Sequence, residues 1–146
     1  MSLYRPPITV LGATQYEHQP LASLSVTPTE NTWYTILNTT TNVLLEWVRV
    51  HQANDQTAAK SLAVRFTIDG QTYVSSYTSC AHDTRYWCML GANGVVYLKT
   101  ADVNPAFYMG LRGKSVKVEV QFADTPGTNQ VLVGFATYAR LKATTL

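Results

Sequence analysis

The chain is short of charge and of cysteine, and it has no long uninterrupted hydrophobic run. Charged residues make up 14% of its 146 residues, against about 25% in an average soluble domain. Its surface must therefore be built from Thr, Ser, Asn and Gln, or another subunit must cover it. Two cysteines are too few for a disulfide scaffold. No apolar run reaches the roughly 18 residues of a membrane-spanning helix.

A strong net charge and a leader segment are also missing. The formal net charge of +2 is too small to attract nucleic acid or a membrane by electrostatics, so we expect neither as a partner. The first ten residues, MSLYRPPITV, contain no long apolar segment, which predicts that there is no secretory signal.

No stretch carries a specific catalytic or cofactor motif, so we expect no enzyme activity, no catalytic residue and no cofactor. The only cluster of soft metal ligands is Cys80-Ala81-His82 with Cys88. Zinc sites usually show tighter paired spacing. The favoured interpretation is two free thiols without metal, with a disulfide across a loop or a zinc site as alternatives. Of the carboxylates on expected strands, Glu119 is predicted to be solvated, and Glu46 to be either a paired inner charge or at an interface.

Alternating hydrophobic and polar residues are the strongest signal in the chain. In LAVRFTIDG, the residues Leu62, Val64, Phe66 and Ile68 fall on one face of a strand. Asp69-Gly70 follows at once, and this dipeptide between two such runs predicts a tight hairpin. The segment Ser115 to Phe122 repeats the pattern, with the four core positions Val116, Val118, Val120 and Phe122.

Two further segments complete the expected sheet structure. Val43 to His51 is a dense apolar run typical of a central strand, and Gln130 to Leu141 reads as a long closing strand. Gly134 and Ala136 give one face of that closing strand small side chains, which suits close approach of another layer or subunit. No apolar pattern holds a helical period. We therefore predict an all-β antiparallel sandwich, with the jelly roll as the favoured topology.

The first 21 residues are predicted to form an extended arm, followed by a single sandwich domain over residues 22–146. Pro6, Pro7 and Pro20 interrupt the arm and block ladder hydrogen bonds. Its apolar side chains either pack along the chain's own sandwich or reach a neighbouring subunit. The arm residues proposed for an oligomer contact are Leu3, Tyr4, Ile8, Val10 and Leu11.

Aromatic residues make up 11% of the chain and are the remaining candidates for a binding site. They are either a platform on which sugar rings stack, or core and interface residues. The candidates are Trp33, Tyr73, Tyr77, Tyr86, Trp87 and Tyr108.

The order of three segments resembles small β-sandwich proteins of tailed-bacteriophage virions. The segments are TWYTILNTTTN, VLLEWVRVHQAN and LAVRFTIDGQTY, which begin at Thr32, Val43 and Leu62. They cover roughly the middle third of the chain and are made of strand-forming rather than reactive residues. The resemblance implies a virion structural role, such as capsid decoration, head fibre or tail component, and a location in the virion after assembly in the host cytoplasm.

Two hypotheses of different classes follow. The first is a self-assembling, non-enzymatic structural protein that forms a trimer or a larger ring and contacts other virion proteins. The second is a carbohydrate-binding sandwich in which an aromatic face stacks on glycans. Stable assembly in solution favours the first, whereas a monomer whose tryptophan fluorescence responds to glycans favours the second.

Overall fold

The computed structural model describes residues 14–101 and 108–143, and within these ranges the chain forms twelve strands in two antiparallel sheets. No helix in this part of the chain is long and apolar enough to cross a membrane. In chain order the strands are β1 (Thr14–His18), β2 (Ala22–Val26), β3 (Trp33–Thr39), β4 (Val43–Ala53), β5 (Lys60–Ile68), β6 (Gln71–Val74), β7 (Thr78–Cys80), β8 (Tyr86–Leu90), β9 (Val96–Thr100), β10 (Leu111–Gly113), β11 (Val116–Phe122) and β12 (Val131–Ala143).

The order of the strands defines a jelly roll. One sheet, called sheet A here, contains the order β2-β12-β4-β8, and the other, sheet B, has the order β3-β11-β5-β6. Numbered along the chain, these eight strands read 1-8-3-6 and 2-7-4-5, which is the double Greek key of a jelly roll. Strands β1, β9 and β10 extend sheet A, and β7 pairs with β5 in sheet B. The predicted fold class is confirmed.

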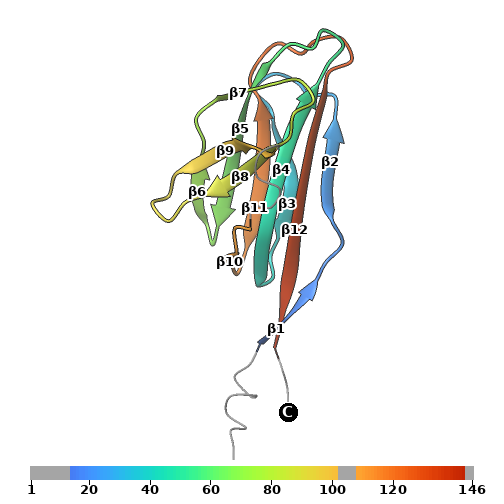
Figure 1. Ribbon diagram of the computed structural model, residues 1–146. Helices are drawn as coiled ribbons and strands as arrows, with labels where there is room; N and C mark the ends of the chain where they lie inside the picture. Colours follow the sequence, from blue (N-terminus) through green and yellow to red (C-terminus); the bar gives the residue numbers. More distant parts are fainter. Residues whose placement is uncertain (1–13, 102–107, 144–146) are drawn as a thin grey trace, which may run out of the picture.

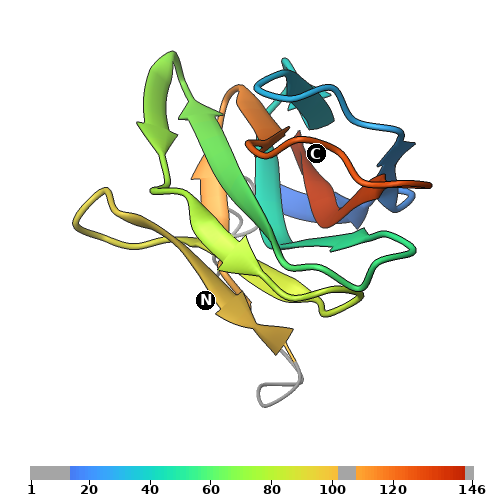
Figure 2. The ribbon, with the colours of Figure 1, turned by 90° about the horizontal axis from the view of Figure 1, so that it is seen from above.

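The two sheets face each other as the layers of a sandwich (Figure 2). The long strands β4 and β12 lie side by side in the middle of sheet A (Figure 1). Beyond the beginning of β4, the end of β12 continues with β1 as a two-stranded ribbon that projects from the sandwich (Figure 1).

The core lies between the sheets and contains the residues expected from the alternation. Phe66 on β5 is fully buried. On β11, Phe122 and the three valines Val116, Val118 and Val120 are also fully buried. Strands β5 and β11 pair directly, with Phe66 opposite Val118. Ile68, at the end of β5, is partly buried against the same core. The predicted facing of both strands is therefore confirmed.

The small-residue face of β12 packs against the opposite sheet of the same chain. A Cβ on Gly134 would lie 2.6 Å from Ile36 Cδ1, so only glycine allows this approach. Ile36 is an extra residue of β3 at this point, since Leu37 pairs with Val118 and Thr35 pairs with Glu119. Ile36 and Leu37 are both buried, although they are consecutive on the strand. Gly134 thus serves contact between the two layers of the sandwich.

Buried amide side chains hold together the end of the sandwich opposite the termini. Gln52 donates from Nε2 to the carbonyls of Ala58 and Cys80, at 3.0 and 3.1 Å. Its Oε1 accepts from Gln130 at 2.9 Å and from Asn54 at 3.2 Å. All donors and acceptors of this small network are used, so a polar core at this end carries little penalty.

The arm expected over residues 1–21 is partly a strand of the sandwich. Thr14 to His18 form β1, which pairs with β12 of the same chain from Ala139 to Ala143. The remaining arm residues Leu3, Tyr4, Ile8, Val10 and Leu11 lie outside the described residues.

Replacing Phe66 by alanine is expected to destabilise the protein by about 3–5 kcal/mol, because the fully buried ring leaves a cavity that the two sheets cannot close. Chemical denaturation followed by circular dichroism measures the loss. The control Val74→Ala, at a side chain that is 51% exposed, should change stability by less than about 0.5 kcal/mol. Equal stability of Phe66→Ala and the parent would contradict the assigned facing of β5.

Candidate functional site

The six aromatic residues singled out from the sequence do not share one face. Tyr86 lies in the core, where its hydroxyl accepts a hydrogen bond from the Ala81 N–H at 2.8 Å. Tyr73 packs against the core from β6. Trp33 lies on the outer face of sheet B, beside Arg65. Tyr77 and Tyr108 are exposed, and Trp87 is buried on sheet A. A flat platform made of all six is not present.

An extra residue in β4 decides which side chains reach the outside of sheet A. Trp47 pairs with Thr137 and Leu45 pairs with Tyr138, so Glu46 between them has no partner on β12. Leu45 is buried before this bulge, and Val48 is buried after it. The alternation therefore changes from odd-in to even-in along one strand.

The bulge places three consecutive odd-numbered side chains of β4, from Trp47 through Arg49 to His51, on the outer face of sheet A. Arg49 pairs with Phe135 on β12 and with Trp87 on β8, so these side chains form one row across three strands. Val131 and Val133 continue the apolar surface along β12, partly exposed. We call this set the outer aromatic face. Its members are Trp47, Arg49, His51, Trp87, Val131, Val133 and Phe135.

Arg49 is held by aromatic rings. Its guanidinium carbon lies 5.5 Å from the centroid of Trp47, 5.8 Å from Trp87 and 5.6 Å from Phe135. The rings of Trp47 and Trp87 meet edge to face with centroids 5.3 Å apart. Its Nε is buried without a hydrogen bond. Cation–π attraction compensates part of the desolvation of this charge.

His51 is the neighbouring outward residue on β4, and it is buried. Its Nδ1 has no hydrogen-bond partner. Burial lowers the pKa of His51 below its usual range; the charge of Arg85 lowers this pKa further, Asp83 opposes the effect, and Arg49 adds to it. His51 is therefore neutral at pH 7, and the outer aromatic face carries its positive charge on Arg49 alone among its own members.

The outer face of sheet B has the opposite character. Arg65 donates from Nε and Nη2 to the two carboxylate oxygens of Glu119, each at 2.9 Å. Lys117 Nζ lies 3.7 Å from the same carboxylate, and the Arg65 guanidinium stacks 4.2 Å from the Trp33 ring centroid. Glu119 is only 5% exposed, so the expectation of a solvated carboxylate was wrong. Neighbouring cations on β5 and on its own strand bury it.

Glu46 is paired, but with an exposed histidine and not as the inner charge that one of the two sequence interpretations expected. Its carboxylate oxygen Oε1 lies 3.1 Å from His18 Nδ1 on β1. The backbone carbonyl of Glu46 also accepts a hydrogen bond from the Met109 N–H at 2.6 Å. The bulge residue thus ties β4 to the segment that enters β10.

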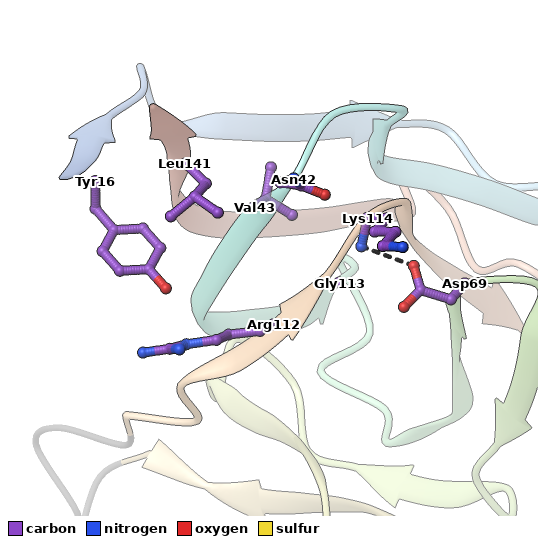
Figure 3. Close-up of a pocket in the computed structure, with 8 residues that line it drawn as sticks. All are labelled: Tyr16, Asn42, Val43, Asp69, Arg112, Gly113, Lys114 and Leu141. Atoms are coloured by element: carbon purple, nitrogen blue, oxygen red, sulfur yellow. Dashed lines mark hydrogen bonds between the residues drawn. The ribbon is translucent and has the colours of Figure 1, made fainter. Parts of the chain in front are cut away.

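A pocket of about 290 Å³ lies at the end of the sandwich where the β1–β12 ribbon begins (Figure 3). Tyr16 and Leu141, which pair across the ribbon, form one wall. Arg112, Lys114 and the hairpin residue Asp69 line the rest with their neighbours. We call this the basal pocket. This pocket could not be predicted from sequence patterns, because its lining residues come from five separate parts of the chain.

The two cysteines are both free and buried. Within residues 14–101 and 108–143, no group of three or more His, Cys, Asp or Glu side chains is placed to hold a metal ion. Burial raises the pKa of Cys80 to about 12 and raises the pKa of Cys88 well above its usual range, with a further contribution from Cys80. Neither thiol is an activated nucleophile, because the thiolate is the reactive form.

Comparison with known proteins gives distant structural similarity alone. No protein-family model matches the chain, and no curated protein matches it. Among solved structures, a chain of the T=1 particles derived from infectious bursal virus covers 90% of this chain, with 10% identity and a TM-score of 0.42. A chain of the VP2 subviral particle of infectious bursal disease virus covers 89%, with 12% identity and a TM-score of 0.39.

This chain spans only about a third of those solved chains, 31% of the first and 33% of the second. At these identities and TM-scores the similarity is remote, and no conclusion about function rests on it. The jelly roll is defined by the strand order of the chain itself.

Acid is expected to destabilise the protein through His51. In the unfolded chain this side chain takes up a proton near its ordinary pKa of 6.5, whereas in the fold its pKa is lower. The unfolded state therefore binds more protons as the pH falls through about 6.5, and stability decreases. The melting temperature should fall more between about pH 7.5 and pH 5.5 for the parent than for His51→Gln. Parallel pH profiles of the two proteins would contradict this.

Cys80 and Cys88 are expected to resist thiol reagents in the folded protein, since their raised pKa values leave almost no thiolate at about pH 8. A chromogenic disulfide reagent should label neither residue within minutes under native conditions. In denaturant without reductant it should label both. Rapid labelling of the folded protein would overturn the assignment, and missing thiols after denaturation would reveal a disulfide.

Proposed function

We propose that the chain is a non-enzymatic structural subunit that assembles with copies of itself, as a component of a virus particle. The observation that carries this proposal is the outer aromatic face. A sheet that faces water on one side normally alternates apolar and polar residues. Here the outward residues Val131, Val133 and Phe135 of β12 are all apolar and only partly exposed.

The difference between the two sheets supports a covered surface on sheet A. The outer face of sheet B carries a bidentate ion pair of Arg65 and Glu119 and is suited to water. The outer aromatic face contains a single unpaired cation among rings and valines. Aromatic side chains and arginine are the types enriched at protein interfaces, where other charged residues are depleted. The low overall charge of 14% agrees with a subunit covered by its copies.

The finer parts of the proposal rest on the sequence. The resemblance of three segments to tailed-bacteriophage virion proteins supports a decoration, head-fibre or tail role within the virion. A trimer or a larger ring, with the residues before β1 reaching a neighbour, fits an apolar segment interrupted by Pro6 and Pro7. A carbohydrate-binding module has less support, since the six aromatic residues point to different faces.

Light scattering at micromolar concentration tests the proposal. The parent should be an oligomer. Phe135→Asp and, separately, Val133→Asp should raise its dissociation constant at least about tenfold, because each buries an unpaired carboxylate in the interface. The matched control Val74→Asp, on the exposed edge of sheet B, should assemble like the parent.

Circular dichroism of each variant must first show an intact sandwich. A monomeric parent would refute self-assembly outright. An oligomer that tolerates both β12 substitutions would keep assembly and exclude the outer aromatic face as its interface. Removal of residues 1–13, which leaves β1 intact, tests the arm separately.

A further inference from the structure

The basal pocket collects polar groups that have no partner within the described chain. Arg112 and Lys114 line it, yet neither side chain forms an ion pair or a hydrogen bond with any described residue. The Tyr16 hydroxyl points into the same space (Figure 3) and is likewise unbonded there. Side chains from β1, β10 and the loop after β10 thus line one small volume.

One oxygen of the carboxylate in the pocket is used by the backbone. Asp69 Oδ1 accepts from the N–H groups of Lys114, at 2.7 Å, and Ser115, at 2.9 Å. These bonds tie the β5–β6 hairpin to the loop between β10 and β11, and Figure 3 shows the first of them. Because the lining contains two cations and one carboxylate, the pocket has a net positive charge.

The geometry of Arg112 leaves its donors available. Its guanidinium carbon lies 5.4 Å from the Tyr16 ring centroid. This contact with the ring occupies none of the N–H groups of the guanidinium, whose fork matches an oxyanion.

Strand pairing holds both walls of the pocket. Arg112 is fixed by pairing with Leu44, and Tyr16 by pairing with Leu141. The Leu141 N–H also donates to the Asn42 carbonyl at 2.8 Å, which closes the ribbon onto the body of the sandwich. Strand pairing thus sets the backbone of Arg112 and Tyr16 before a ligand arrives, while the side chains of Arg112 and Lys114 are exposed to solvent.

We propose that the basal pocket binds a small oxyanion, held by the Arg112 fork, the Lys114 ammonium and the Tyr16 hydroxyl. A volume of about 290 Å³ is at the lower end of the range for ligand pockets, so it suits one small molecule. The group that the pocket would recognise is a carboxylate or a phosphate, which are both oxyanions. Val43 and Leu141 add an apolar wall that a compact carbon skeleton can contact. This site is independent of the proposed assembly through the outer aromatic face.

Calorimetric titration of the full chain with inorganic phosphate and with glucuronate, at constant ionic strength, tests the site and separates the two sources of the oxyanion. Glucose serves as the uncharged control and should not bind. We expect a dissociation constant of about 1 mM or below for at least one anion. Tighter binding of glucuronate would identify a sugar acid, and tighter binding of phosphate a phosphorylated ligand.

Two arginine variants decide whether the pocket is responsible. Arg112→Gln should weaken binding at least about tenfold, since it removes a charged, two-pronged contact. Arg140→Gln removes the same charge from an exposed position of β12 that does not line the pocket, and should change binding less than about twofold. Lys114→Gln should give an intermediate loss.

Two results would overturn the proposal. One is that neither anion binds at about 10 mM, a concentration well above the expected dissociation constant. The other is that Arg140→Gln weakens binding as much as Arg112→Gln, which would mean general attraction to a basic surface. Since the oligomeric state is measured separately, failure of this site leaves the assembly proposal standing, and a monomer leaves this test valid.

Discussion

The register between β4 and β12 is the constraint on which the rest of the molecule depends. The two strands pair over ten positions, from Ala53 opposite Val131 to Val43 opposite Arg140, with one extra residue at Glu46. In a strand, a shift of one residue moves every later side chain to the other face. Without the bulge, Trp47, Arg49 and His51 would point into the core beside Leu45. With it, Val48 and Val50 fill the core, and a tryptophan, a cation and a histidine face outward.

The two sheets then differ in how they treat charge. Sheet B satisfies Glu119 with a two-pronged bond from Arg65, so its outer face is stable in water. Sheet A surrounds Arg49 with three rings and leaves its Nε buried without an acceptor. A desolvated cation and an apolar strand face cost free energy when isolated, and contact with another surface lowers that cost. This asymmetry is the link between the fold and the self-assembly that we propose.

The jelly roll also creates the basal pocket. Its connections bring the β3–β4 turn, the β5–β6 hairpin and the β10–β11 loop to the same end, where the β1–β12 ribbon projects beyond β4 (Figure 1). Asp69 fastens two of these turns together, and its φ of +50° lies in the left-handed region that the predicted Asp-Gly hairpin requires. A turn signal in the sequence thus becomes one wall of a cationic pocket.

Local patterns were enough to predict the sandwich. Alternation in β5 and β11 gave their buried faces, and Asp69-Gly70 gave the hairpin between β5 and β6, because side-chain period and turn geometry are short-range properties. The six aromatic residues could not be placed by the same means. Tyr86 and Trp87 are adjacent on β8, yet Tyr86 points into the core and Trp87 lies on the outer face of sheet A. What only the tertiary structure decided was the bulge at Glu46, the burial of Glu119 and the meeting of Tyr16 with Arg112, since each depends on pairing between strands that are distant in the sequence.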